Sequence, residues 1–486
     1  MDRRLLTDSD LRLRPGRGER SPWLRDALAA EGDPPPAAPL RGSAEADVAI
    51  IGGGYTGLWT AYQVLQESPD LGVVLLEADI CGSGPSGRNG GFVNSWWDEA
   101  SGLIEAFGED GARACLDEAA ASVHAIGTFC ESHGVDAELT SSGMLVVSTT
   151  PEHDGRWQED VRAAALLGDP DALRSLSAAE VAARCRSPRF RGGALMRDGA
   201  TVQPAMLARG LRRVCLVRGL RLHEGTRAER VAPGPGGSLR VVTADGEVRA
   251  RRVVLAVNAW SGGWREGRGR TLAWGSYMVR SEPAPDLIAS ELGWTGGESI
   301  VDARFSVHYL HVTRDGRIAI GAGGGKPGMG GGIGASFTDD TDSALRAAFA
   351  FRWLFPQLRE VRLTDAWGGP IDVSPDHLPH VWTAHEGRML IAAGYSGNGV
   401  GPSHLLGRIC AALARDSDDP VTRLPIVGPP RPRFPPEPFR YVGARVLRAA
   451  MIRREDGEEA GRRAPRWLRE LSRLPRRLGY HLGPGG

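Results

Sequence analysis

Hydrophobic and polar positions follow a strand, helix, strand order near the beginning of the chain. An apolar run at residues 48–51 leads into Gly52-x-Gly54-x-x-Gly57 and a helical run, and a second apolar run follows at residues 73–76. Short apolar runs bounded by glycine are typical of buried strands, and these glycines stand where the first strand passes into the helix. The pattern predicts a βαβ unit, the first part of a parallel sheet covered by helices.

Further along the chain, helical and strand patterns alternate. Apolar and small residues recur at three- and four-residue spacing from Phe107 to His133, which predicts a long amphipathic helix that ends at Gly134. Ser177-x-x-Glu180 is a capping box that opens another helix, because each side chain can accept a hydrogen bond from the other residue's backbone. The remaining predictions are helices from Pro204 and over 402–415, and strands near 143–148, 220–222, 239–243, 252–257 and 389–393.

Residues 270–321 carry a β pattern. Arg314-Asp315-Gly316-Arg317 interrupts it as a hairpin turn, which predicts an antiparallel pair of strands. One side of this pair is an apolar and aromatic face made of Phe305, Val307, Tyr309 and His311. Two interpretations of this face stay open: a core face in which the imidazole has a partner, or a roof over a ligand site.

These elements predict an α/β fold of two domains, because a chain of 486 residues is too long for one simple core. One domain is Rossmann-type and dinucleotide-binding, with a β-sheet and helices in three layers, and the other is an α+β substrate domain with an antiparallel sheet. The predicted division is an N-terminal arm at 1–44, the Rossmann-type domain in three parts at 45–100, 191–262 and 365–418, a helical insertion of the substrate domain at 101–190, its antiparallel sheet at 263–364, and a basic tail at 419–486.

Composition narrows the functional classes. The formal net charge is zero, so no overall field attracts nucleic acid or a membrane, and neither is expected as a partner. The chain has no apolar run of about 18 residues, and its N-terminus lacks the apolar core of a secretory signal, so a cytoplasmic location is expected. The six cysteines have no CxxC or CxxH spacing, which favours reduced core thiols and predicts no metal site.

The C-terminal tail is the exception in charge. Residues 421–486 contain 15 arginines and six acidic residues. A short helix predicted at 441–454 combines arginine with apolar side chains. It is expected to dock on the protein or to be solvated, with contact to lipid or to a partner as the alternative.

The βαβ unit carries a dinucleotide-binding fingerprint. Gly52 permits a tight turn, Gly54 lets the backbone approach a pyrophosphate, and Gly57 lets the helix pack on the sheet. Glu77 lies 20 residues after Gly57 at the end of the second strand, where its carboxylate can accept hydrogen bonds from ribose hydroxyls. An adenine dinucleotide is therefore predicted. A glycine-rich turn without a ligand is the alternative, since glycine makes up 66 of the 486 residues.

Two later segments distinguish FAD from NAD. Ser86-Gly87-Arg88-Asn89-Gly90-Gly91 follows the second strand, and Gly397-Asn398-Gly399-Val400 leads from a buried strand into a helix. In these motifs the sequence, over residues 47 to about 415, resembles the D-amino-acid oxidase family of FAD-dependent oxidoreductases, which includes glycine, sarcosine and γ-glutamylputrescine oxidases. The resemblance implies FAD contacts at Gly52, Gly54, Tyr55, Thr56, Gly57, Glu77, Ala78, Ser86, Arg88, Asn89, Gly90, Gly91, Ala228, Gly397, Asn398, Gly399 and Val400.

The resemblance also implies a reaction. A flavin in this family accepts a hydride at N5 from a carbon that bears an amine, and the imine product hydrolyses to an aldehyde or oxo acid. The sequence looks closest to γ-glutamylputrescine oxidase-like enzymes and to a group proposed to act on aminophosphonates, so a small amine or amino acid with an anionic group is the expected substrate. The alternatives are an FAD-dependent hydroxy-acid dehydrogenase or hydroxylase, and a non-catalytic flavin-binding protein. The expected catalytic residues are Tyr309, His311, Trp367 and Tyr395, with Arg280 or Arg304 facing an anionic substrate group.

Three positions depart from the relatives in this family. Gly369 stands where monomeric sarcosine oxidases tether flavin through a cysteine, and Arg88 where dimethylglycine-type enzymes use a histidine, so noncovalent FAD is expected. Ala319 replaces a lysine that helps oxygen react in sarcosine oxidases, so oxygen and a quinone-type acceptor both stay open. The glycine-rich loop before Lys326 lacks the Gly-Lys-Ser/Thr of a phosphate loop, which favours a flexible loop over a ligand contact.

Overall fold

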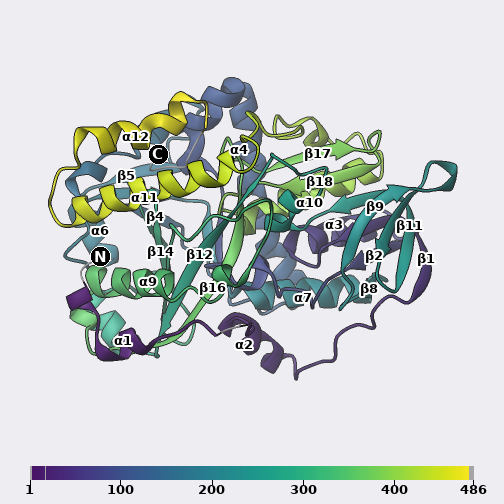
Figure 1. Ribbon diagram of the computed structural model, residues 1–486. Helices are drawn as coiled ribbons and strands as arrows, with labels where there is room; N and C mark the ends of the chain where they lie inside the picture. The colour runs from purple at the N-terminus through teal and green to yellow at the C-terminus, as the bar shows by residue number, and fades with distance from the viewer. Residues whose placement is uncertain (1–2, 17, 481–486) are drawn as a thin grey trace.

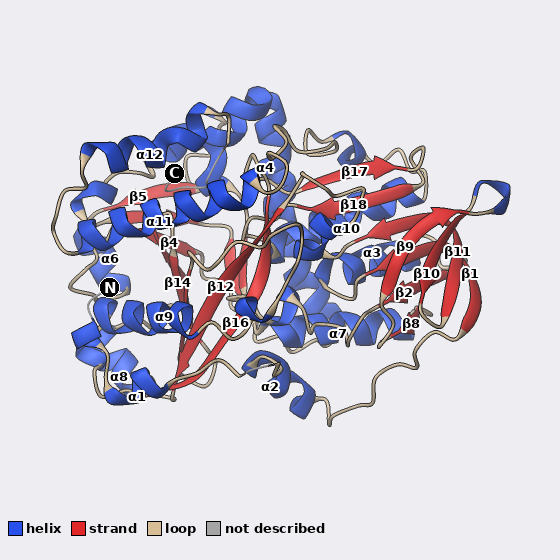
Figure 2. Cartoon of the chain, in the orientation of Figure 1, coloured by secondary structure: helices blue, strands red, loops and turns tan. Residues whose placement is uncertain are grey.

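The computed structural model describes residues 3–16 and 18–480 and contains two large sheets (Figures 1 and 2). The first is an eight-stranded sheet whose main path has the order β17-β18-β11-β1-β2-β8. Strand β1 pairs in parallel with β2 and β11, as the predicted βαβ unit requires. The bounds are β1 (Gly42–Ile51), β2 (Val73–Leu76), β8 (Arg221–His223), β9 (Ala228–Pro233), β10 (Leu239–Thr243), β11 (Gly246–Leu255), β17 (His380–Ala384) and β18 (Met389–Ala393).

Both faces of the first sheet are covered, which explains why its central strands are continuous apolar runs. Helices α3 (Tyr55–Glu67) and α10 (Val400–Ala414) pack against each other on one face, with α7 (Pro204–Val217) beside α3. The ribbon of β9 and β10 contributes Leu239 and Val241 to the apolar cluster on the other face. The helix, sheet and ribbon layers form the predicted Rossmann-type domain.

The second sheet also has eight strands, in the order β16-β12-β15-β14-β13-β4-β6-β5, and is antiparallel except where β13 pairs with β4. The predicted hairpin at Arg314–Arg317 is confirmed, because it joins β14 and β15. Helix α9 (Thr341–Leu354) packs on this sheet. The bounds are β4 (Met144–Val147), β5 (Leu173–Leu176), β6 (Gly193–Met196), β12 (Leu272–Ser281), β13 (Ser299–Asp302), β14 (His308–Val312), β15 (Ile318–Ala322) and β16 (Leu363–Val373).

Several elements differ from their predicted extent. Strand β14 begins at His308, so Phe305 and Val307 lie in the loop before it and do not continue its aromatic face. Helix α4 (Ala100–Ser132) begins earlier than predicted, because Gly108 at φ +71° joins a shorter helical segment to it through a kink. The capping box at Ser177 and Glu180 is formed at the start of α6 (Ala178–Arg184). The remaining elements are β3 (Phe92–Asn94), which pairs with β7 (Gly199–Thr201), α5 (Gln158–Leu166) and α8 (Pro285–Leu287).

Two strands lie in the second sheet, although the expected domain boundaries assign them to the Rossmann-type domain. β6 begins at residue 193 and β16 extends to residue 373, and both are hydrogen-bonded in the second sheet. Residues 191–262 and 365–418 were expected in the Rossmann-type domain. The chain therefore crosses from the second sheet to the first beyond each expected boundary. The complete division into domains remains a prediction.

The N-terminal arm is anchored at buried points rather than laid on the surface. In α1 (Asp8–Arg12), the buried Asp10 carboxylate pairs with Arg352 of α9 at 2.8 Å. Helix α2 (Pro22–Ala30) packs on α7 and buries Trp23 and Leu24, which are 2% and 0% exposed. The arm thus runs from the second sheet to the first along the lower side of the molecule in Figure 1.

The C-terminal tail forms two helices that dock on the rest of the chain. α11 (Phe439–Glu459) is longer than predicted, and α12 (Arg466–Arg477) packs beside it (Figure 1). The Glu455 carboxylate accepts a hydrogen bond from the Ser306 backbone N–H at 3.0 Å, which ties α11 to the loop before β14. Within residues 3–16 and 18–480, none of the helices combines the length and the apolar content needed to cross a bilayer.

Candidate active site

A cavity of about 1980 Å³ is lined by both glycine-rich halves of the predicted cofactor site, by the second sheet and by the tail helices. Its size exceeds the roughly 300–1,000 Å³ typical of a pocket for one drug-sized ligand. One end carries Glu77 and Ala228, and another part of the wall carries Tyr309 and Asn398. The cavity is therefore large enough for a dinucleotide together with a second ligand.

The fingerprint glycines lie where backbone segments approach closely. Gly52 has φ +109°, and a Cβ atom on it would lie 2.4 Å from the carbonyl oxygen of Ala256. A Cβ atom on Gly57 would lie 2.0 Å from the carbonyl oxygen of Gly52, so a side chain would push α3 away from β1. Helix α3 follows Gly54 directly, which places the N–H groups of its first turn at the cavity.

Glu77 lies across the fingerprint loop. Its carboxylate accepts hydrogen bonds from the backbone N–H of Gly53 at 2.7 Å and of Asp79 at 2.8 Å. Burial raises the pKa of Glu77, and these two N–H donors act in the opposite direction. Ala78 and Ala228 line the same part of the cavity. The carboxylate is held at the place where the sequence predicts the ribose.

The second glycine-rich loop is held by its own polar side chains. The Ser86 hydroxyl accepts a hydrogen bond from the Tyr55 backbone N–H at 2.9 Å, and the Asn89 side chain accepts one from the Gly91 N–H at 2.7 Å. The Arg88 guanidinium donates to the carbonyls of Ser83, Gly368 and Glu19 at 3.0, 3.1 and 2.9 Å. Arg88 therefore ties this loop to β16 and to the N-terminal arm.

A buried hydrogen bond joins the two halves of the cofactor site. The hydroxyls of Thr56 and Tyr395 lie 2.5 Å apart, although the two residues are 339 positions apart in the sequence. Gly397 adopts φ +95° in the bend before α10. Gly397, Asn398 and Val400 line the cavity, so the third predicted motif faces the same space as the first two.

Asp372 is a site residue that the sequence analysis missed. It is fully buried on β16 and accepts hydrogen bonds from the Tyr395 N–H at 3.1 Å, from the Asn258 side chain at 2.8 Å and from the Gly394 N–H. Burial raises its pKa to about 6. The sequence could have indicated Asp372, because it is the one carboxylate in the apolar and glycine-rich run Gly368–Val373. A carboxylate buried in such a run needs hydrogen-bond donors around it.

The four predicted catalytic residues lie in two layers. Tyr309 and Tyr395 line the cavity, and the Tyr309 hydroxyl lies 2.8 Å from that of Ser276. His311 and Trp367 lie behind this wall. The His311 ring stacks on Trp23 at 6.1 Å between centroids, and the Trp367 indole donates to the Arg88 carbonyl at 2.9 Å. Burial lowers the pKa of His311 to about 4, so its imidazole is neutral at physiological pH.

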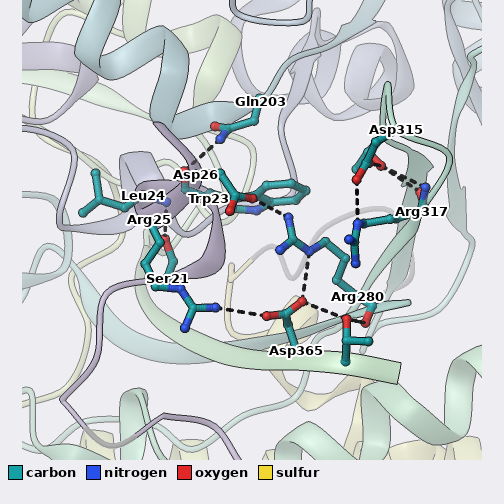
Figure 3. Close-up of polar contacts among 12 residues, drawn as sticks. Ser21, Trp23, Leu24, Arg25, Asp26, Gln203, Arg280, Asp315, Arg317 and Asp365 are labelled. Carbon is teal, nitrogen blue, oxygen red and sulfur yellow. Dashed lines mark hydrogen bonds and ion pairs between the residues drawn. The ribbon is translucent and has the colours of Figure 1, made fainter. Parts of the chain in front are cut away.

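The two arginines expected to face an anionic substrate are paired with carboxylates. Arg280 pairs with Asp26 at 2.7 Å and with Asp365 at 3.2 Å, and its guanidinium lies over the Trp23 ring (Figure 3). Arg304 pairs with Glu455 at 3.3 Å and also with Glu459. These carboxylates neutralise the charges that the sequence analysis assigned to substrate binding.

Two further positions of interest lie outside the cavity wall. Lys326 forms an ion pair with Asp340 at 3.1 Å, and its side chain is 51% exposed. Ala319 is fully buried in one cluster with Trp23 and Trp367. At the position where sarcosine oxidases have the oxygen-activating lysine, this chain therefore has an alanine that packs against the N-terminal arm.

The residues present fit an FAD molecule. Asn258 Oδ1 and Asn398 Oδ1 are buried acceptors at the cavity that lack a hydrogen-bond partner within residues 3–16 and 18–480, and FAD offers hydroxyl and N–H donors. Helices α3 and α10 both begin next to glycine, at Gly54 and Gly399, where backbone N–H groups can meet anionic oxygens. The donors and acceptors of the cavity wall therefore match a dinucleotide with a polar ring edge.

Comparison with known proteins agrees with this geometry. Residues 47–413 match the family described as FAD dependent oxidoreductase (DAO). A probable oxidoreductase OrdL of Rhizobium meliloti is 30% identical over 77% of this chain and 84% of its own length. The γ-glutamylputrescine oxidoreductase of Escherichia coli is 28% identical over 83% of this chain and 92% of its own length. Glycine oxidase of Geobacillus kaustophilus shares the fold, with a TM-score of 0.62 and 20% identity over 77% of this chain and 96% of its own.

The motifs, the cavity and these similarities agree on one assignment. The matched range includes all three glycine-rich segments that line the cavity, from the fingerprint at Gly52 to the bend before α10. This chain belongs to the DAO family of FAD-dependent oxidoreductases, it is an enzyme, and its cofactor is FAD.

Proposed function

We propose that this enzyme oxidises the C–N bond of a small amine or amino acid. The observation that carries the proposal is the single cavity, which continues from the FAD-binding motifs to a wall containing Tyr309, Ser276 and Met144. Similarity to a γ-glutamylputrescine oxidoreductase and a glycine oxidase supports an amine as the reacting group.

When bound, FAD supplies the acceptor for a hydride from the carbon that bears the amine. The chain supplies position and electrostatics. The first turn of α10, after Gly399, offers backbone N–H groups to negative charge at the cofactor edge. His311 is neutral above a pH of about 4, so it places no positive charge behind the wall. The amine reacts in its neutral form, because only a nitrogen with a free lone pair can stabilise the adjacent carbon as the hydride leaves, and water then converts the imine product to a carbonyl compound and ammonia or a primary amine.

Anaerobic mixing of the FAD-loaded enzyme with candidate substrates tests this proposal. Loss of the oxidised-flavin absorbance with amines or amino acids supports it. Loss with hydroxy acids alone would indicate a hydroxy-acid dehydrogenase, and loss with NADPH would indicate a hydroxylase. An unchanged spectrum with all three groups would favour a non-catalytic flavin-binding protein.

We also infer that FAD is held without a covalent bond. Gly369 and Arg88, the two positions at which relatives attach flavin, face each other: a Cβ atom on Gly369 would lie 3.2 Å from the Cβ of Arg88. Neither glycine nor arginine forms the thioether or histidyl link of those relatives. Acid precipitation should leave FAD in the supernatant, whereas a yellow pellet would show covalent attachment.

The packing around Ala319 concerns the electron acceptor. Ala319 is packed in the cluster with Trp23, so no lysine ammonium is available at that position. We therefore expect reduced enzyme to react faster with a quinone or dye than with oxygen. Stopped-flow reoxidation with each acceptor measures this difference, and an equal or greater rate with oxygen would contradict the inference.

A further inference from the structure

A group of carboxylates lies beside the cofactor-binding loop, at the point where the chain passes from β3 into α4. Asp98 and Glu99, in the turn Trp97–Glu99, line the cavity. Asp160 of α5 lies behind them and accepts hydrogen bonds from the Ser101 hydroxyl at 2.6 Å and from its backbone N–H at 3.0 Å. Three acidic side chains thus share one partly buried region.

The carboxylates of this acidic group repel one another. Burial and the neighbouring Asp160 raise the pKa of Asp98 to about 7, and burial raises that of Asp160 to about 6. Burial, followed by repulsion from Asp98 and Asp160, raises the pKa of Glu99 well above its ordinary value. His377 Nδ1 lies 3.7 Å from a Glu99 oxygen and forms an ion pair with it when the imidazole is protonated. The site would be stabilised by a positive charge.

A second observation indicates that the charge comes from a ligand. Asn94 is 5% exposed and lines the same cavity, and its Oδ1 atom has no hydrogen-bond partner in the described part of the chain. Its amide nitrogen faces Met144 Sδ at 2.9 Å, which leaves the oxygen as the free end. Asp98 Oδ1 is likewise buried and unpartnered in residues 3–16 and 18–480. An ammonium group carries three N–H donors and one positive charge, which matches these acceptors.

Two arginines of this wall, Arg304 and Arg448, already have partners. Arg304 is paired with Glu455 and Glu459, and Arg448 donates to the carbonyls of Gly324 and Gly325, both at 2.7 Å. The expectation of an anionic substrate group depended on Arg280 and Arg304 and has lost that support. In the segment 94–99, the cavity-lining side chains of Asn94 and Asp98 each present a buried oxygen that lacks a hydrogen-bond partner in the described part of the chain.

We propose that Asp98, Glu99 and Asn94 bind a second, positively charged amine of the substrate, so that the enzyme acts on a diamine or polyamine. This inference rests on the proposed amine oxidation. One amine, in its neutral form, presents its carbon to the cofactor, and the distant ammonium is held by the acidic group. Asn94 lies only three residues beyond Gly91, the last residue of the flavin-binding loop, so the site is near the cofactor end that this loop contacts in the family.

Matched ligands test the inference. The FAD-loaded enzyme is mixed anaerobically with 1,4-diaminobutane and with 1-aminobutane, which differ only in the second amine. The concentration for half-maximal flavin reduction should be at least tenfold lower for the diamine. In Asp98→Asn the ratio between the two half-maximal concentrations should fall at least tenfold, because a charge-assisted hydrogen bond to the second amine is lost. Asp110→Asn, an exposed residue on α4, is the control and should behave as the wild type.

Binding can be measured without turnover. A diamine whose amine-bearing carbons carry no hydrogen, 2,5-dimethylhexane-2,5-diamine, cannot donate a hydride. Calorimetry should show that it binds the oxidised enzyme at least tenfold more tightly than tert-butylamine, and that Asp98→Asn removes the difference. Because Asn matches Asp in shape and relieves repulsion, the variant should keep its FAD absorbance.

The outcomes distinguish a failure of the diamine inference from a failure of the proposed amine oxidation. If 1-aminobutane and amino acids reduce the flavin as well as the diamine, and Asp98→Asn changes nothing, the diamine inference is wrong and amine oxidation stands. A preference for anionic amines, lost on Arg448→Gln, would also overturn the inference. If no amine reduces the flavin, the proposed function itself fails.

Discussion

Replacing Trp23 by alanine should weaken FAD binding, although the Trp23 side chain does not line the cofactor cavity. Trp23 is 2% exposed, and its indole N–H donates to the carbonyl of Asn89 in the flavin-binding loop at 3.1 Å. The Gln203 side chain in turn donates to the Trp23 carbonyl at 2.8 Å (Figure 3). Trp23 therefore connects the N-terminal arm to the loop and to α7.

The expected magnitude follows from burial. Truncating a buried tryptophan to alanine costs about 3–5 kcal/mol in the free energy of unfolding. The lost hydrogen bond to Asn89 accounts for about 0.5–1.5 kcal/mol of that cost. Its loss loosens the loop that binds the cofactor, so the FAD dissociation constant should rise about tenfold, which corresponds to about 1.4 kcal/mol.

Two comparison variants make the measurement interpretable. Trp23→Phe keeps a ring against His311 and Arg280 but removes the indole donor, so it should lose about 1 kcal/mol. Trp467→Ala removes a tryptophan that is 60% exposed on α12 and should stay within about 0.5 kcal/mol of the wild type. Denaturant unfolding and FAD titration of the apoprotein supply both numbers. If Trp23→Ala keeps wild-type stability and FAD affinity, the arm has no part in the cofactor site.

Three more predictions concern single interactions in the cavity wall. Glu77→Ala should weaken FAD binding at least tenfold, because charge-assisted hydrogen bonds are worth about 1.5–3 kcal/mol each, and unchanged fluorescence quenching of FAD would refute the ribose contact. Thr56→Val and Tyr395→Phe should each lower FAD affinity, and a double-mutant cycle should give a coupling of about 0.5–3 kcal/mol; additive effects would show that the hydrogen bond joins nothing. Asp372 has a folded-state pKa of about 6, above the ordinary 3.8, so its stabilising effect is complete below about pH 3.8 and is lost as the pH rises through 6. Relative to Asp372→Asn, wild-type stability should fall by about 3 kcal/mol between pH 4 and 7 in denaturant unfolding, and a flat difference would contradict the assignment.

The parts of the fold that depend on local pattern could be predicted from the sequence. The capping box at Ser177 and the hairpin at Arg314–Arg317 are fixed by neighbours within a few positions, where backbone geometry and hydrogen bonding select the residue type. The fingerprint glycines are recognised by their spacing, although Gly52 is also constrained by the distant carbonyl of Ala256. The three glycine-rich segments also meet in one cavity, as the resemblance implied. Motif spacing and the family resemblance therefore predicted which glycine-rich segments line the cavity, but not Asp372.

Interactions between distant segments could not be predicted in this way. Trp23 contacts a loop 66 positions away, and Asp372 accepts hydrogen bonds from residues 22 to 114 positions away. Arg280 looked like an anion-binding group because Asp26 and Asp365, its partners, are far from it in sequence. No sequence motif predicts the acidic group at Asp98, because its third member, Asp160, lies on a different helix. Such pairings are set by tertiary packing, which a single sequence does not display.

The tail helices determine how far the cavity is covered on one side. Side chains of α11 and α12, including Phe439, Met451 and Leu474, form part of the cavity wall, yet they are made after both halves of the cofactor site. The fingerprint loop and the bend before α10 both lie before residue 415, whereas the helices that cover this side of the cavity lie after it. The chain thus separates the segments that hold the cofactor from the segments that limit access to it, and a tail variant should change access before it changes the cofactor motifs.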